Sequence, residues 1–253
     1  MLNFRVISIL LFSIAILVTI LDIFFVDIHY SVYILILVFY SGLVIGGAFL
    51  IGMNFFVRAV NSFVTDKKEI ALTFDDGPSA LYTPKVLDLL NKYDAKGTFF
   101  CIGKSLESER VLAERILKEG HLIGNHTYGH SPFFPFYRKK RVVEEISRTN
   151  NIIQEISGKA PLAFRPPYGI TNPSIAGAIN HLGMKVFGWN IRSFDTTAKD
   201  FRKVVKRVTA QIKPGAIILL HDNRPDIAKI LEEVLLFAEK NNYRCTLIPH
   251  MQE

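Results

Sequence analysis

Cysteine is scarce in this sequence of 253 residues, which contains only Cys101 and Cys245. Two cysteines cannot form the disulfide framework that staples small secreted domains, so the sequence excludes that class of scaffold. Both cysteines lie inside apolar, β-prone runs, 98–102 and 244–248, and we predict that their thiols are buried.

The sequence also lacks a nucleic-acid-binding motif, and its basic residues are scattered over several predicted helices. The formal net charge is +7. A moderately basic chain suits an anionic partner such as phosphate head groups, and a solvated surface explains the charge equally well. We therefore predict no nucleic-acid partner.

Charge is nearly absent from residues 1–57, which carry only Arg5, Asp22 and Asp27. The runs 6–21 and 32–57 contain no charged residue at all, and a membrane-spanning helix needs about 20 apolar residues. A cleaved signal peptide is the alternative for the first run, but that run is too long and no small-x-small cleavage site closes it. We predict a two-helix membrane anchor over 1–57, followed by a linker over 58–68.

The flanking charges predict which side of the membrane the rest of the chain occupies. Arg5 precedes the first run, Arg58, Lys67 and Lys68 follow the second, and the connector 27–31 has neither Lys nor Arg. Because Lys and Arg near short flanks favour the cytoplasm, this pattern favours a cytosolic domain. If the first run were cleaved or re-entrant, the domain would be exported.

Residues 69–253 alternate between strand-like and helical patterns. Three stretches keep apolar residues on one helical face: 142–156, 201–212 and 227–238. Seven strand-like runs are separated by such crossovers: 70–74, 97–102, 122–124, 162–164, 185–189, 216–220 and 244–248. Strands joined by helices form a parallel sheet covered on its faces, so the fold class is α/β. An irregular seven-stranded barrel and an open sheet both fit this pattern.

Polar residues follow these strands repeatedly, and in parallel α/β folds the chemistry gathers at the carboxyl ends of the strands. Two like charges side by side at the mouth of a buried strand cost free energy unless a metal ion or a cation compensates them. The polar residues at the strand ends are Asp75 and Asp76, Asn125 and His126, Arg165, Asp195, and His221 with Asp222.

His126 and His130 form an H-x3-H pair that could share one metal ion if the segment is helical or tightly turned. Two histidines and one carboxylate leave a position open for water, as hydrolytic Zn²⁺-like sites require. The other carboxylate could then take a proton from that water, held ionised by Arg165. His221, with a carboxylate such as Asp195 beside it, is a candidate general acid.

Four motifs in order resemble the polysaccharide deacetylase family, which shares the NodB homology domain and includes peptidoglycan N-acetylglucosamine deacetylases and chitin deacetylases. The resemblance covers roughly 69–248. The motifs are Thr73-Phe74-Asp75-Asp76-Gly77-Pro78, His126-Thr127-Tyr128-Gly129-His130, Arg165-Pro166-Pro167-Tyr168-Gly169 and Leu219-Leu220-His221-Asp222.

The resemblance implies a distorted (β/α) barrel and a divalent metal ion, most often Zn²⁺. It implies that Asp75 is the general base, that Arg165 holds Asp75, and that His221 is the general acid, tethered by Asp195. The backbone N–H of Tyr168 would stabilise the oxyanion. The implied metal ligands are Asp76, His126 and His130, and the implied substrate contacts are Pro167, Tyr168 and Leu219.

These observations predict a hydrolase that removes an N-acetyl or similarly small N-acyl group from amino sugars of a polysaccharide or a lipid-linked glycan. An O-deacetylase of acetylated polysaccharide would use the same site. A non-enzymatic alternative is a catalytically silent glycan-binding membrane protein, and it would require a lost base or ligand.

Two segments bear on the substrate. The family often has Asp-x-x-Asp-Trp within 189–196, where this chain has Arg192 for the first Asp and Thr196 for the Trp. The aromatic run 132–137 and the basic run 138–141 follow His130. They could cap the barrel and begin a solvated helix, or they could meet a lipid carrier and its phosphate.

Overall fold

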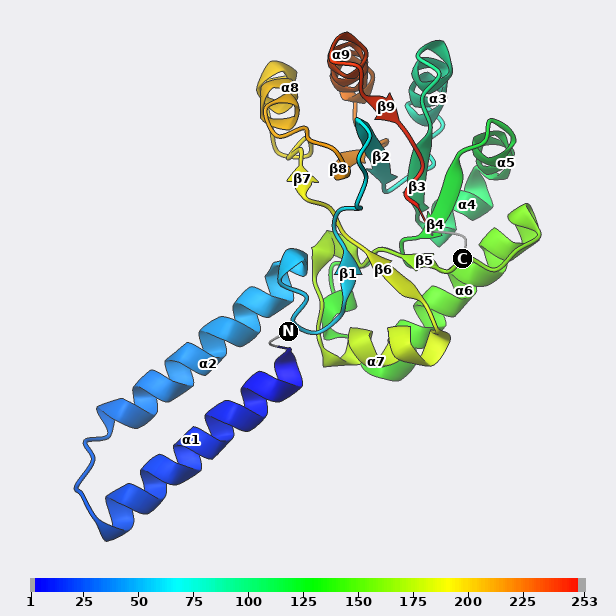
Figure 1. Cartoon of the computed structure of the whole chain (residues 1–253). Coiled ribbons are helices and arrows are strands. Elements are labelled where there is room, and N and C mark those ends of the chain that lie inside the picture. The colour runs from blue at the N-terminus through cyan, green and yellow to red at the C-terminus, as the bar shows by residue number, and fades with distance from the viewer. Residues whose placement is uncertain (1–2, 250–253) are drawn as a thin grey trace.

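The structure is a computed structural model that describes residues 3–249. Figure 1 shows two long helices projecting from a curled sheet that is surrounded by further helices. The projecting helices are α1 (Phe4–Phe24) and α2 (Ser31–Phe49), and both are long and apolar enough to cross a membrane. Only 6% of the most apolar window of each is buried, so neither is a core helix of the sheet domain.

The N-terminal end of α1 and the C-terminal end of α2 lie beside the sheet (Figure 1). The backbone N–H of Phe4 donates to the carbonyl of Phe55 at 3.0 Å, and the Phe4 ring lies 5.0 Å from the ring of Phe56. The start of α1 and the end of α2 therefore lie on the same side of the hairpin.

One parallel sheet carries the rest of the chain, in the strand order β1-β6-β5-β4-β3-β2-β8-β7, with β9 also paired to β2. Its curl confirms the predicted distorted (β/α) barrel, left open between β1 and β7. The strands are β1 (Ala59–Val60), β2 (Glu69–Asp75), β3 (Gly97–Cys101), β4 (Leu122–Asn125), β5 (Ala163–Phe164), β6 (Lys185–Phe187), β7 (Ile191–Arg192), β8 (Ala216–His221) and β9 (Arg244–Cys245).

The sheet has two more strands than the seven predicted. The additional strands, β1 and β7, have two residues each, too few to produce a visible alternation in the sequence. β1 lies within the segment predicted as a linker, and Ser62 in that segment also bridges Ala216. Residues 58–68 thus pair with the sheet at two places.

The helices cover the outside of the sheet, and the three predicted helical patterns correspond to α6, α8 and α9. Helix α6 ends at Gly158, whose φ of 75° is the left-handed value that favours glycine. The helices are α3 (Thr83–Lys92), α4 (Gly103–Ser108), α5 (Arg110–Lys118), α6 (Lys139–Ser157), α7 (Pro173–Leu182), α8 (Phe201–Thr209) and α9 (Ile227–Lys240), with 3-10 turns η1 (Ile51–Met53), η2 (Phe134–Phe136) and η3 (Pro167–Gly169).

Alternation along the central strands separates the helix-packed side of the sheet from the barrel interior. In β2, Leu72 and Phe74 pack in the main core cluster, whereas Ala71 packs in the interior cluster that also contains Ile217 of β8. Because side chains alternate along a strand, Asp75 shares the interior face with Ala71. His221 shares it with Ile217 on the neighbouring strand.

Both cysteines are free thiols, and the predicted burial is complete only for Cys101. Cys101 is fully buried and Cys245 is half-buried. Burial raises the pKa of the Cys101 thiol well above its usual value and that of Cys245 to about 12, so neither is a reactive thiolate at neutral pH.

Candidate active site

The two adjacent carboxylates after β2 have different surroundings. Asp75 ends the strand and is 3% exposed. Asp76 has a left-handed φ of 74°, which turns the chain out of the sheet. Gly77 is required next, since a Cβ at this position would overlap the buried carboxylate of Asp222. The turn therefore directs neighbouring carboxylates to different partners.

The histidine pair lies on a tight loop after β4 rather than on a helix. The loop is held by Asn125, whose side-chain oxygen accepts from the N–H of Thr127 at 2.8 Å. The Thr127 hydroxyl oxygen accepts from the N–H of His130 at 3.1 Å. These bonds bring the His126 and His130 rings to a centroid distance of 4.8 Å.

The protonation state of His126 suits a metal ligand. Its Nδ1 lies 2.8 Å from the carbonyl oxygen of Arg165, which can only accept a hydrogen bond, so Nδ1 carries the proton and Nε2 keeps its lone pair. Burial and the neighbouring His130 lower the pKa of His126 to about 3, with Asp76 acting against them. His126 is therefore a neutral imidazole.

Asp76, His126 and His130 fit a metal ion. Asp76 Oδ1 lies 3.6 Å from His126 Nε2 and 3.4 Å from His130 Nε2, and three ligand atoms of this set lie within 4.8 Å of one another. Those separations are long for hydrogen bonds. The two distances from Asp76 come close to the spacing of about 3.3 Å between two ligands that are each about 2.0–2.1 Å from a tetrahedral Zn²⁺.

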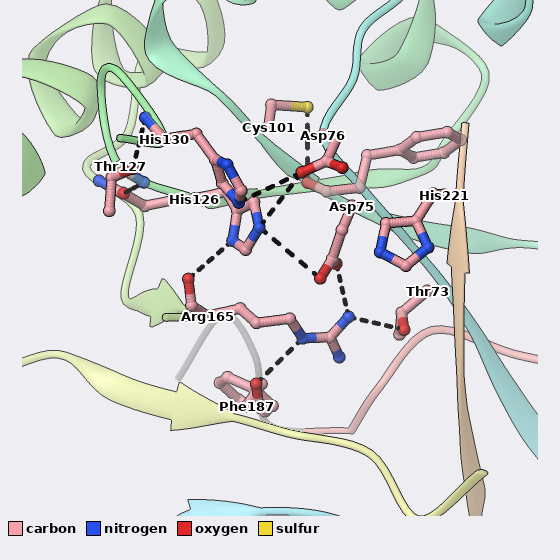
Figure 2. A network of polar contacts seen from close by, with 12 residues as sticks. Thr73, Asp75, Asp76, Cys101, His126, Thr127, His130, Arg165, Phe187 and His221 are labelled. Atoms are coloured by element: carbon pink, nitrogen blue, oxygen red, sulfur yellow. Dashed lines mark hydrogen bonds and ion pairs between the residues drawn. The ribbon is translucent and has the colours of Figure 1, made fainter. Parts of the chain in front are cut away.

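Asp75 is held by Arg165, which is completely buried (Figure 2). One guanidinium nitrogen of Arg165, Nη1, donates to Asp75 Oδ1 at 2.7 Å and to the Thr73 hydroxyl at 2.8 Å. The other donors bind the carbonyls of Phe187 and Gly188. Burial lowers the pKa of Arg165 and the pairing with Asp75 opposes this, so the guanidinium stays charged near neutral pH.

That pairing leaves the second carboxylate oxygen of Asp75 facing the metal ligands. Asp75 Oδ2 lies 3.8 Å from His126 Nε2. A carboxylate with one oxygen fixed by a buried guanidinium and the other beside a metal site is well placed to accept a proton from water.

His221 and Asp195 form the second hydrogen-bonded pair of the site. Asp195 Oδ1 lies 2.7 Å from His221 Nδ1, and Oδ2 accepts from the His221 backbone N–H at 2.8 Å. Burial lowers the pKa of His221, but the hydrogen bond and charge of Asp195 outweigh it and the net pKa is raised. Burial likewise opposes the net lowering of the Asp195 pKa that His221 and Ser193 produce.

The remaining predicted residues border these groups. Tyr168 has a left-handed φ of 61°, and its ring lies 4.8 Å from the ring of His130. Within residues 3–249 its backbone N–H has no hydrogen-bond acceptor, so it can donate to a ligand. Pro167 is buried in the same turn. Leu219 lies two residues before His221 in β8, on the same interior face.

Comparisons with known proteins show which family this chain resembles. The family model described as "Polysaccharide deacetylase" matches residues 64–187. A peptidoglycan-N-acetylglucosamine deacetylase of Bacillus cereus is 36% identical over 200 residues, covering 74% of this chain and 89% of that protein. The chain belongs to the polysaccharide deacetylase family.

Some relatives are much longer than the part of them that this chain matches. The peptidoglycan-N-acetylglucosamine deacetylase PgdA of Listeria monocytogenes is 34% identical over 184 residues, which is 73% of this chain and 39% of that protein. The structure of peptidoglycan deacetylase PdaC from Bacillus subtilis matches with a TM-score of 0.69 and 33% identity, covering 74% of this chain and 91% of that chain. Residues 1–57 lie outside the family match.

The segment 189–196 departs from the polysaccharide deacetylase pattern, and the structure shows what stands there. The Arg192 guanidinium lies over the Phe194 ring at 4.9 Å and over the Trp189 ring at 5.7 Å. Phe194 is 44% exposed. An arginine that lies near two aromatic rings thus stands where the family often has the first acid.

Sequence reasoning gave no role to three buried polar side chains of the site. The Thr73 hydroxyl accepts a hydrogen bond from Arg165 and donates one to the Ile218 carbonyl at 2.7 Å. Ser193 donates to Asp195 at 2.9 Å. Burial raises the pKa of Asp222 to about 7, although Thr83 donates to it. Only the alternation of β2 could have indicated Thr73, since it lies two residues before Asp75.

Proposed function

We propose that this protein is a metal-dependent hydrolase that removes the N-acetyl, or a similarly small N-acyl, group from amino-sugar units of a glycan. One observation carries the proposal. Of two adjacent carboxylates, Asp75 is paired with a buried guanidinium and Asp76 faces two histidines. A base beside a metal site is the minimum that hydrolysis of an unactivated amide requires.

Asp76, His126 and His130 would hold the ion, most suitably Zn²⁺, which when bound polarises the amide carbonyl and acidifies water. Asp75 accepts a proton from the attacking water at Oδ2, because Arg165 occupies Oδ1. The water oxygen bonds to the amide carbon, and the backbone N–H of Tyr168 donates to the oxygen on which negative charge develops.

The carbon–nitrogen bond then breaks. Asp195 binds Nδ1 of His221, which leaves Nε2 to protonate the departing sugar amine. Acetate carries away the water oxygen, and the amine carries the proton from His221. Leu219 and Pro167, both buried, would bound the space for the acyl methyl.

The relatives' names support an amino-sugar glycan as the substrate class. We further propose that α1 and α2 span a membrane, with the catalytic domain on the side where both of their outer ends lie. Arg5 at one end and Arg58, Lys67 and Lys68 beyond the other favour the cytosolic side. A cytosolic domain would act on a glycolipid or lipid-linked sugar at the inner leaflet.

Metal analysis and acetate release test the proposed activity. The full chain, purified in detergent, should contain one divalent ion per molecule and release acetate from N-acetylglucosamine oligomers, with Asp75→Asn as the inactive control. Release from O-acetylated xylan alone would replace the proposal with an O-deacetylase. A metal-loaded chain that binds glycans and releases no acetate would show a silent binding protein.

A further inference from the structure

Residues 133–141, here the aromatic-basic segment, expose two large rings beside a buried one. Phe134 is fully buried in the core cluster that also contains Ile51, just beyond α2. Its neighbours Phe133 and Phe136 are 67% and 83% exposed. The buried ring fixes the segment to the domain, and the exposed rings project from a rigid base.

The second half of the segment carries four exposed cations. Within the described residues 3–249, none of the four forms an ion pair with an acidic side chain. Arg141 instead stacks on Tyr137 at 3.7 Å from the ring centre. A surface hollow of about 430 Å³ lies among these groups, lined by Phe136, Tyr137, Arg138, Lys140, Arg141 and Glu144. Cations without acidic partners, beside exposed aromatic rings, suit an anionic and partly apolar surface.

Two adjacent residues connect this segment to the end of α2. The N–H of Thr171 donates to the carbonyl of Ala48 at 3.0 Å, and its hydroxyl donates to the carbonyl of Gly47 at 3.3 Å. The next residue, Asn172, donates to the carbonyl of Pro135 at 2.6 Å. The aromatic-basic segment therefore lies directly beside the last turn of α2.

The candidate active site also lies close to the last turn of α2. Tyr168 precedes Thr171 by three residues, and consecutive Cα atoms are 3.8 Å apart, so their Cα atoms lie within about 11 Å of each other. Ile51, two residues past the end of α2, also approaches Gly188, whose carbonyl accepts a hydrogen bond from Arg165. The end of α2 thus supports the catalytic loop from behind.

We propose that the aromatic-basic segment lies in the headgroup layer of an anionic phospholipid bilayer, the same bilayer that α1 and α2 cross. The inference rests on the proposed membrane anchorage. Aromatic side chains favour the interface between lipid and water, and Lys and Arg are attracted to anionic lipid surfaces. Contact of this segment with the bilayer holds the catalytic loop at headgroup height, so the sugar that is deacetylated is one carried on or beside a lipid.

Quenching by brominated lipid tests this contact. The full chain is reconstituted in nanodiscs of phosphatidylcholine and phosphatidylglycerol, with and without brominated acyl chains, as Phe136→Trp or as the control Val111→Trp. Val111 is 81% exposed on α5, which lies far from α1 and α2 in Figure 1. Trp189 is the only native tryptophan and contributes equally to both variants. Phe133→Trp provides a second reporter on the other side of Phe134.

The added fluorescence at 136 should be lost in brominated nanodiscs, whereas that at 111 should remain. Replacing the four cations by glutamine should restore much of the fluorescence at 136. Equal quenching at 136 and 111, or quenching at 136 that the charge replacement does not change, would overturn the proposal. Acetate release from a soluble glycan is measured on the same samples, so a failed contact and a failed enzyme give different results.

Discussion

Removing the buried guanidinium should cost this protein much of its stability as well as its activity. Arg165→Met retains most of the side-chain length and removes the charge and every donor. The change leaves the Asp75 carboxylate buried without its partner, and it leaves the carbonyls of Phe187 and Gly188 without the donors that they have now.

The size of the loss follows from burial. Arg165 is 0% and Asp75 3% exposed, and breaking a buried ion pair by removing one partner costs roughly 3–5 kcal/mol. For a domain of this size, each 1 kcal/mol lowers Tm by about 2–4 °C, so Tm should fall by roughly 6–20 °C. The control Lys92→Met breaks an exposed pair with Glu232 and should change Tm little.

The assay is thermal or urea unfolding of the full chain in detergent with a chelator present, followed through Trp189. Asp75→Asn in the Arg165→Met background removes the stranded charge, so it should recover stability while activity stays absent. The coupling between the two substitutions should be roughly 0.5–3 kcal/mol. Additive losses, or a single loss below about 1 kcal/mol, would refute the account of Arg165 as the partner of a buried charge.

Three further predictions concern the chemistry and the membrane. Asp75→Asn should keep the metal and lose nearly all turnover. The ligand variants Asp76→Asn, His126→Ala and His130→Ala should lose bound metal as well, as measured by elemental analysis. Equal metal loss in all four variants would mean that the two carboxylates exchange roles. Asp195 raises the His221 pKa, so activity that needs protonated His221 should fall only above the ordinary pKa of a histidine. In Asp195→Asn this alkaline limb of the rate profile should move to lower pH, and an unmoved limb would remove His221 from the acid role. Protease added to intact spheroplasts should spare the domain, and digestion without lysis would show an exported enzyme.

The polar groups of the site could be predicted because they follow strands in the sequence. A parallel sheet places the carboxyl ends of its strands at one edge, so residues as distant as Asp75 and His221 must meet there. The register pairs these two residues directly across β2 and β8. The two uncharged runs 6–21 and 32–57 likewise predicted two apolar helices, since length and composition are local properties.

Tertiary structure alone decided what each group does. The residues themselves left open which carboxylate of the pair meets the histidines, and it is the left-handed backbone at Asp76 that separates it from Asp75. The tautomer of His126 depends on the carbonyl of Arg165, 39 residues away in sequence. Two-residue strands such as β1 give no periodicity, because they exist only through pairing with a partner.

The contact between α2 and the loop after Tyr168 is also a feature that only the tertiary structure decided. Nothing near Thr171 in the sequence indicates that its partners are Gly47 and Ala48, in a stretch whose composition indicates only a membrane helix. The last carbonyls of a helix have no partner within the helix and accept whatever donor the fold brings to them. Composition therefore determined that two long apolar helices exist, and the fold determined that the last carbonyls of α2 accept hydrogen bonds from Thr171, three residues after Tyr168.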